Sequence, residues 1–146
     1  MHKREQRLLP LKELAGVRER NQAAVLGQSE RRLSEAERRL QDLLRYRQEY
    51  EQSFHRTATA GAPMRGLREQ QVFIARLNEA VRAQQMVLEQ IRDECVLAHQ
   101  HWREAATRKQ VVGKVVERAR QEAFVKDERR QQIENDERAM HSRVSR

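Results

Sequence analysis

The sequence TATAGAPMRG, residues 57–66, decides the fold, because it is the one clear interruption of an otherwise helical pattern. Two glycines and one proline lie within six residues of one another, and the charge nearly vanishes. Such a combination disfavours a continuous helix. We therefore predict one domain over residues 1–146, made of a helix at about 8–56, a hinge at 57–66 and a second helix at about 67–142.

The composition on both sides of the hinge is that of long, solvated helices. Lys and Arg number 30, Asp and Glu 22 and Gln 16, while aromatic residues make up only 4% of the chain and the mean hydropathy is −1.00. These charged and amide side chains are good helix formers, whereas disordered chains are enriched in Pro, Ser and Gly. So few apolar residues leave little for a globular core, which argues against a compact enzyme.

Apolar residues recur at heptad spacing on both sides of the hinge and predict a two-stranded seam. The upstream seam consists of Leu26, Leu33, Ala36, Leu40, Leu43, Tyr50 and Phe54. The downstream seam consists of Leu67, Ile74, Leu77, Val81, Leu88, Ile91, Cys95, Ala98, Trp102, Ala105 and Val112, and it continues weakly through Val116, Ala119, Ala123, Ile133, Met140 and Val144.

Two such helices can fold back on each other, and each then covers the apolar stripe of the other. In a parallel homodimer Pro63 would instead lie inside a continuous helix, at a cost of about 3 kcal/mol. The sequence therefore favours an all-α fold, a long antiparallel two-helix coiled-coil hairpin.

The second predicted helix is longer than the first by ~40 Å at ~1.5 Å per residue. We therefore expect a protruding C-terminal helix, from about Glu117 onward. Its apolar pattern is sparse and is interrupted by Lys126, Arg130 and Glu137. Because an isolated helix of this kind is marginal in water, the protrusion predicts a partner that receives it.

The net charge of +8 is spread evenly, with +4 in residues 1–60 and +4 in residues 61–146. Many basic residues have an acidic neighbour one helical turn away, which is typical of a solvated helix surface. A basic-zipper protein would need a dense basic block directly before its zipper, but residues 25–30 contain no basic residue. We expect no nucleic-acid binding, although a basic coiled-coil nucleic-acid-binding protein stays as an alternative from another class.

Patterns that resemble chemical sites are incomplete. The spacing of Gly61 and Gly66 matches a phosphate loop, but the Lys and the Ser or Thr that must follow are absent. Cys95 and His99, with His101 nearby, supply too few ligands for a metal site. The sequence therefore predicts no catalytic residue, no cofactor and no metal.

The sequence also carries indications of the compartment. A single cysteine cannot form an intrachain disulfide, and the N-terminus lacks the apolar stretch of a signal peptide. No run approaches the ~18 apolar residues of a membrane span. We expect a reducing cytoplasm, with peripheral membrane association through partner proteins only.

A third row of apolar residues lies beside the seam, although two rows per helix are enough for a two-stranded coiled coil. Tyr46 precedes the seam of the first helix, and Phe73, Ala80 and Val87 run one position ahead of the seam in the second. Exposed aromatic residues on a charged surface are candidate anchors for a protein partner. A slightly widened seam is the other interpretation of the same row.

Together with the hinge and the third row, several stretches resemble the FliJ family, the small coiled-coil component of the bacterial flagellar type III export apparatus. They are PLKELAGVRE (10–19), LLRYRQEY (43–50), EQQVFIARLNEAV (69–81) and HWREAATRKQ (101–110). The resemblance covers almost the whole chain, and it rests on Tyr46, Tyr50, Gln71, Phe73 and Trp102 at a matching length and break.

The resemblance implies a non-catalytic role in flagellar motility. Proteins of this family resemble the central stalk of rotary ATPases: the paired termini enter a hexameric export ATPase, another part contacts the cytoplasmic domain of the export gate protein, and export chaperones are escorted. The implied localisation is the inner face of the cell membrane at the flagellar base. A related stalk protein of virulence-type injectisomes is the alternative within the same class. The implied gate contact comprises Leu43, Tyr46, Tyr50, Phe73, Leu77 and Ala80, with Gln84 and Arg39 at its edge.

Overall fold

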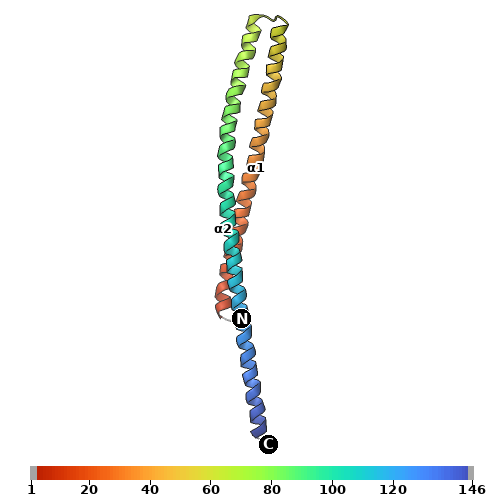
Figure 1. Cartoon of the computed structure of the whole chain (residues 1–146). Helices are drawn as coiled ribbons and strands as arrows, with labels where there is room; N and C mark the ends of the chain where they lie inside the picture. The colour runs from red at the N-terminus through yellow and green to blue at the C-terminus, as the bar shows by residue number, and fades with distance from the viewer. Residues whose placement is uncertain (1–2, 145–146) are drawn as a thin grey trace. The chain divides into compact units, whose positions relative to one another are not determined.

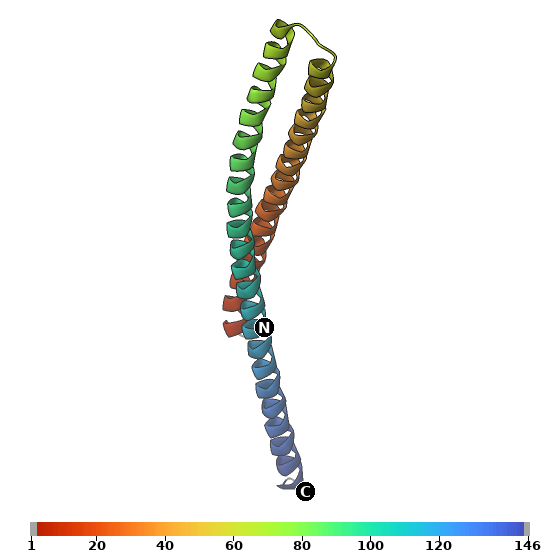
Figure 2. The same cartoon turned by 45° about the horizontal axis from the view of Figure 1, so that its top comes forward.

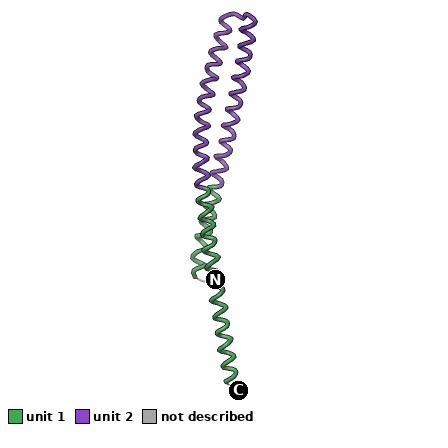
Figure 3. The backbone as a smooth tube through the Cα atoms, viewed as in Figure 1, with its two compact units in different colours: residues 1–22, 102–146 green, residues 23–101 purple. Residues whose placement is uncertain are grey.

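The computed structural model describes residues 3–144, which form two α-helices, α1 (Lys3–Thr59) and α2 (Met64–Val144). The two helices run in opposite directions and pack against each other (Figures 1 and 2), so the predicted all-α antiparallel hairpin is confirmed. The chain divides into two compact units (Figure 3). Unit 1 comprises residues up to Gln22 and from Trp102, and unit 2 comprises residues 23–101.

The turn between the helices is confined to residues 60–63, which is shorter than the predicted hinge. The side-chain hydroxyls of Thr57 and Thr59 donate to carbonyl oxygens one turn earlier, at 2.7 Å each, and the helix continues through both residues. Gly61 then ends α1 with a φ of +77°, a conformation that glycine adopts without a steric penalty.

Backbone hydrogen bonds complete the end of α1. The Ala62 N–H donates to the Thr57 carbonyl and the Gly61 N–H to the Ala58 carbonyl, each at 3.2 Å. This is the Schellman pairing, which satisfies carbonyls that the helix leaves without partners. Pro63 follows at once, and its carbonyl accepts the first bond of α2 from the Leu67 N–H at 3.3 Å.

The core of unit 2 forms where the two predicted seams meet. Ala36 of α1 packs with Leu88 and Ile91 of α2, and Leu33, Leu40 and Cys95 cover this buried group. Each of these residues belongs to a predicted heptad row. The heptad pattern therefore identified the core residues of unit 2.

Removing a core side chain from unit 2 should lower its stability. Leu88 is only 4% exposed, so Leu88→Ala removes buried methyl groups and leaves a cavity that the neighbouring side chains fill only in part. We expect a loss of about 2–4 kcal/mol in the free energy of unfolding, measured by urea denaturation. Met86→Ala, at an exposed position two residues away, is the control and should change the stability by less than about 0.5 kcal/mol.

Unit 1 is built around small side chains instead. Its buried apolar residues are Ala15, Val116, Ala119 and Ala123. At the start of α1, the Glu5 carboxylate is buried and accepts a bond from Arg120 Nε at 3.1 Å. Arg4 bonds Glu122 at 2.9 Å. These contacts explain why α1 begins at Lys3 instead of near residue 8, with Pro10 inside the helix.

The C-terminal segment, residues 124–144, continues α2 (Figure 3). Every residue of the segment is exposed. Because α1 begins earlier than predicted, the protrusion starts after Ala123 instead of near Glu117. Ile133 and Met140, which the heptad pattern counted as a weak seam, are 59% and 67% exposed. At about 1.5 Å per residue the segment is ~31 Å long.

Neither helix contains, within residues 3–144, a stretch that is long and apolar enough to cross a bilayer.

Candidate partner-binding site

Two aromatic rings from different helices meet on the surface of unit 2. Tyr50 of α1 and Phe73 of α2 lie with ring centroids 4.4 Å apart and ring planes tilted by 39°. Tilted aromatic pairs at this distance attract each other beyond the burial of their area. Yet Tyr50 is 39% exposed and Phe73 is 41% exposed, so the pair is still open to solvent.

Tyr46 lies one helical turn before Tyr50 on α1 and is 52% exposed. We call the exposed rings of Tyr46, Tyr50 and Phe73 the aromatic surface. Beside it, the Arg47 guanidinium donates to the Asn78 side-chain oxygen at 3.4 Å, a polar contact between the same two helices. The structure thus brings together the rings of Tyr50 and Phe73, which are 23 positions apart in sequence.

The remaining predicted contact residues differ in their burial. Leu43, Leu77 and Ala80 are half-buried, as expected for side chains between the seam and the surface. Gln84 is buried at 9% exposure, and its Nε2 donates to the Ala36 carbonyl at 3.1 Å. The Gln84 side chain therefore forms part of the contact between the two helices. Arg39, predicted at the edge, is exposed and lines a shallow depression with Arg32, Glu35 and Val87.

The sequence interpretation missed Val72, which is exposed beside Phe73. Val72 and Phe73 line a concavity together with Arg65, Arg68, Glu69 and Arg76. Val72 belongs to no heptad row, so the period that found Phe73 could not find it. The aromatic surface is consequently flanked by an exposed aliphatic side chain and three arginines on α2.

An exposed cluster of this kind is suited to binding, not to reaction. The aromatic rings offer apolar faces that a partner can bury, and arginines at the rim can bond its polar groups. All three aromatic residues are at least 39% exposed, so part of each ring is open to solvent. No group of three or more potential metal-ligating side chains occurs among residues 3–144, and the pair of Cys95 and His99 acquires no third ligand.

Cys95 lies in the seam of unit 2, half-buried against the core around Leu88. Burial raises the pKa of its thiol, and the nearby carboxylates of Glu30 and Glu94 raise it further. Only the thiolate is nucleophilic, so reactivity should be low at neutral pH. At pH 8 we expect iodoacetamide to alkylate Cys95 more slowly in the folded chain than in the same chain unfolded in urea. Equal rates would contradict a buried thiol.

The fold defines a class: an all-α protein built as an antiparallel two-helix hairpin. A family model described as "Flagellar FliJ protein" matches residues 3–145. The chain therefore belongs to the FliJ family, whose members are non-catalytic structural components of the flagellar export apparatus. Comparison with curated proteins and with solved structures yields no match.

Proposed function

We propose that this protein is the stalk of the flagellar export ATPase. Unit 1, which holds both chain ends, enters the central pore of the hexameric ring. Unit 2 binds the cytoplasmic domain of the export gate protein through the aromatic surface. The protein lies in the cytoplasm and reaches the inner face of the cell membrane at the flagellar base through these partners alone.

The observation that carries the proposal is the full exposure of the helical C-terminal segment. Its residues 124–144 form a helix although none of their side chains is buried. Helices in proteins gain most of their stability from tertiary packing of an apolar face, and this segment has no such packing within the described chain. A ring of subunits that surrounds the segment would supply the missing contacts to Phe124, Ile133 and Met140, which are all exposed.

The charges of the same segment fit a surrounding ring better than a single flat partner. Basic and acidic side chains alternate along it: Lys126, Asp127, Glu128, Arg129, Arg130, Glu134, Asp136, Glu137, Arg138 and Arg143. Five positive and five negative charges leave no net charge. Such a surface offers contacts of both signs in every direction and no strong preference for one orientation.

The proposed mechanism is mechanical. Ring subunits in different nucleotide states differ in shape, and a stalk that contacts these states unequally shifts their populations. By linkage, nucleotide binding then changes the affinity of the ring for the stalk by the same factor. Contact of unit 2 with the gate would transmit this change to the export channel. Escort of export chaperones is part of the same proposal.

The test is stimulation of ATP hydrolysis by the cognate export ATPase. The chain alone should hydrolyse no ATP, because it belongs to a non-catalytic family. Added to the ATPase, it should raise the hydrolysis rate and promote ring assembly, seen as hexamers by sedimentation. An unchanged rate and an unchanged ring population at saturating chain would refute the stalk proposal.

A further inference from the structure

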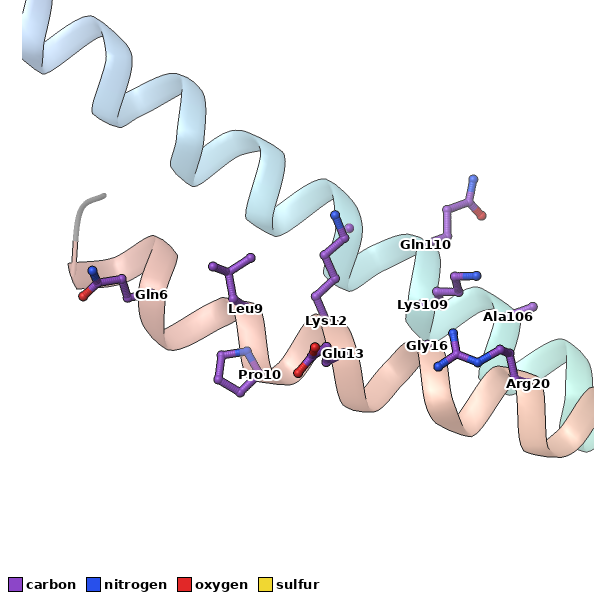
Figure 4. Close-up of a pocket in the computed structure, with 11 residues that line it drawn as sticks. Gln6, Leu9, Pro10, Lys12, Glu13, Gly16, Arg20, Ala106, Lys109 and Gln110 are labelled. Carbon is purple, nitrogen blue, oxygen red and sulfur yellow. The ribbon is translucent and has the colours of Figure 1, made fainter.

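A groove runs between the two helices of unit 1 (Figure 4). Its volume is 860 Å³. One wall belongs to α1, from Gln6 to Arg20, and the other to α2, from Ala106 to Gly113. The groove shares no residue with the aromatic surface or with the C-terminal segment, whose exposed side chains carry the proposed contacts to the gate and to the ring.

Three of the residues that line the groove have little or no side chain: Gly16, Ala106 and Gly113. Gly113 is not needed for the backbone, because among residues 3–144 only Gly61 has a positive φ. Nor is it needed for packing within the chain, because a Cβ added there would meet nothing within 4 Å. A glycine in a helix interior costs about 1 kcal/mol relative to alanine. Close approach of another molecule would explain why this position is a glycine.

The rim of the groove is positively charged. Lys12, Arg20 and Lys109 line it, against the single carboxylate of Glu13. Lys109 lies 3.8 Å from the Glu19 carboxylate, whereas Lys12 and Arg20 form no ion pair with any residue of 3–144. Figure 4 shows Lys12 extending from α1 toward α2. Two cations without partners therefore line the groove together with Gly113, next to which there is room for an apolar side chain.

The walls add apolar contacts and set the shape of the occupant. Leu9 and Pro10 line the groove, and Leu14 and Val17 are exposed on the same stretch of α1. The α1 wall is ~21 Å long and the α2 wall ~10 Å long at 1.5 Å per residue. An amphipathic helix that inserts side chains at positions i, i+4 and i+7 spans about the length of the shorter wall.

We propose that this interhelical groove binds an acidic amphipathic helix of a partner protein. Its apolar side chains lie over Gly113, and its carboxylates face Lys12 and Arg20. The partner is thus defined by chemistry: a helical segment with large aliphatic residues on one face and Asp or Glu along both edges of that face.

The probe is a stapled helical peptide of about 18 residues, with Leu at i, i+4 and i+7 and Glu along both flanks. A second peptide carries Lys in place of every Glu. Each is labelled with fluorescein and titrated with the full chain while anisotropy is followed. The Glu peptide should bind saturably, more weakly as salt is raised, and at least about tenfold more tightly than the Lys peptide.

The decisive variant is Gly113→Leu, which places a large side chain at a residue that lines the groove. It should weaken binding of the Glu peptide at least about tenfold. The matched control is Gly66→Leu in unit 2, where an added Cβ also meets nothing within 4 Å; its affinity should equal that of the unchanged chain. Both substitutions favour the helix, so thermal melts should show no loss of fold.

Three results would overturn the proposal. One is a Glu peptide that fails to saturate below about 1 mM. Another is equal affinity for the Gly113→Leu chain or for the Lys peptide. The third is a sedimentation coefficient that rises with concentration and loses this dependence in Gly113→Leu, because a second copy would then be the occupant. ATPase stimulation by the C-terminal segment and gate binding by the aromatic surface are tested separately, because neither of these parts contains a residue that lines the groove.

Discussion

A chain that ends at Ala123 should lose most of its stimulation of the export ATPase. The deleted segment contributes no buried residue to unit 1, and the truncated chain keeps the ion pairs of Arg4 with Glu122 and of Glu5 with Arg120. The remaining helix pair should therefore stay folded, while the proposed contacts to the ring disappear. We expect the concentration for half-maximal stimulation to rise by more than about tenfold, which corresponds to a loss of at least about 1.4 kcal/mol.

Two substituted chains separate the role of side chains from that of length. Ile133→Ser with Met140→Ser removes two exposed apolar residues from the segment and should reduce stimulation almost as much as the truncation. Gln131→Ser with Gln132→Ser changes neighbouring exposed polar residues and should leave stimulation unchanged. Circular dichroism checks that all chains remain helical. Full stimulation by the truncated chain would show that this segment does not enter the ring.

The hairpin could be predicted from the sequence because its determinants are local or periodic. The hinge depends on Gly61 and Pro63, whose backbone preferences act without regard to the rest of the fold. The core depends on a seven-residue period, which places Ala36, Leu88 and Ile91 on facing stripes. Both signals can be recognised without knowledge of any long-range contact.

The start of α1 could not be predicted in the same way. A proline is normally tolerated only in the first turn of a helix, so Pro10 points to a start near residue 8. The first turns form nonetheless, because Glu5 and Arg4 bind Arg120 and Glu122. These partners lie more than one hundred residues away in sequence, and neither periodicity nor propensity indicates them.

Gln84 illustrates a different limit. It lies seven residues after Leu77 and seven before Ile91, so the heptad period alone assigns it to the seam. The family resemblance implied a place at the edge of the gate contact, but the amide donates to the Ala36 carbonyl and is satisfied while buried. The interhelical groove could not be predicted for a related reason. Gly16 and Gly113 line it, and residues without a side chain give no apolar signal in a sequence.

Replacement of Tyr46 by alanine should abolish most binding to the cytoplasmic domain of the export gate while leaving the fold intact. Tyr46 is 52% exposed and belongs to no buried cluster, so the free energy of unfolding should change by less than about 0.5 kcal/mol. An aromatic anchor that becomes buried in an interface typically costs about 2 kcal/mol or more when truncated. We therefore expect at least a roughly thirtyfold weaker affinity for the gate domain by calorimetry, together with reduced swimming motility.

Phe73→Ala should give the same loss of gate binding with a small additional cost. Its ring packs on Tyr50 at 4.4 Å, and loss of that pair should lower the stability by about 0.5–1.5 kcal/mol. Val96→Ala removes an exposed apolar side chain of unit 2 outside the aromatic surface and should leave gate binding unchanged. Stimulation of the ATPase should survive in all three variants, because unit 1 is untouched. Unaltered gate affinity in both aromatic variants, or loss of helicity in Tyr46→Ala, would rule out the aromatic surface as the gate contact.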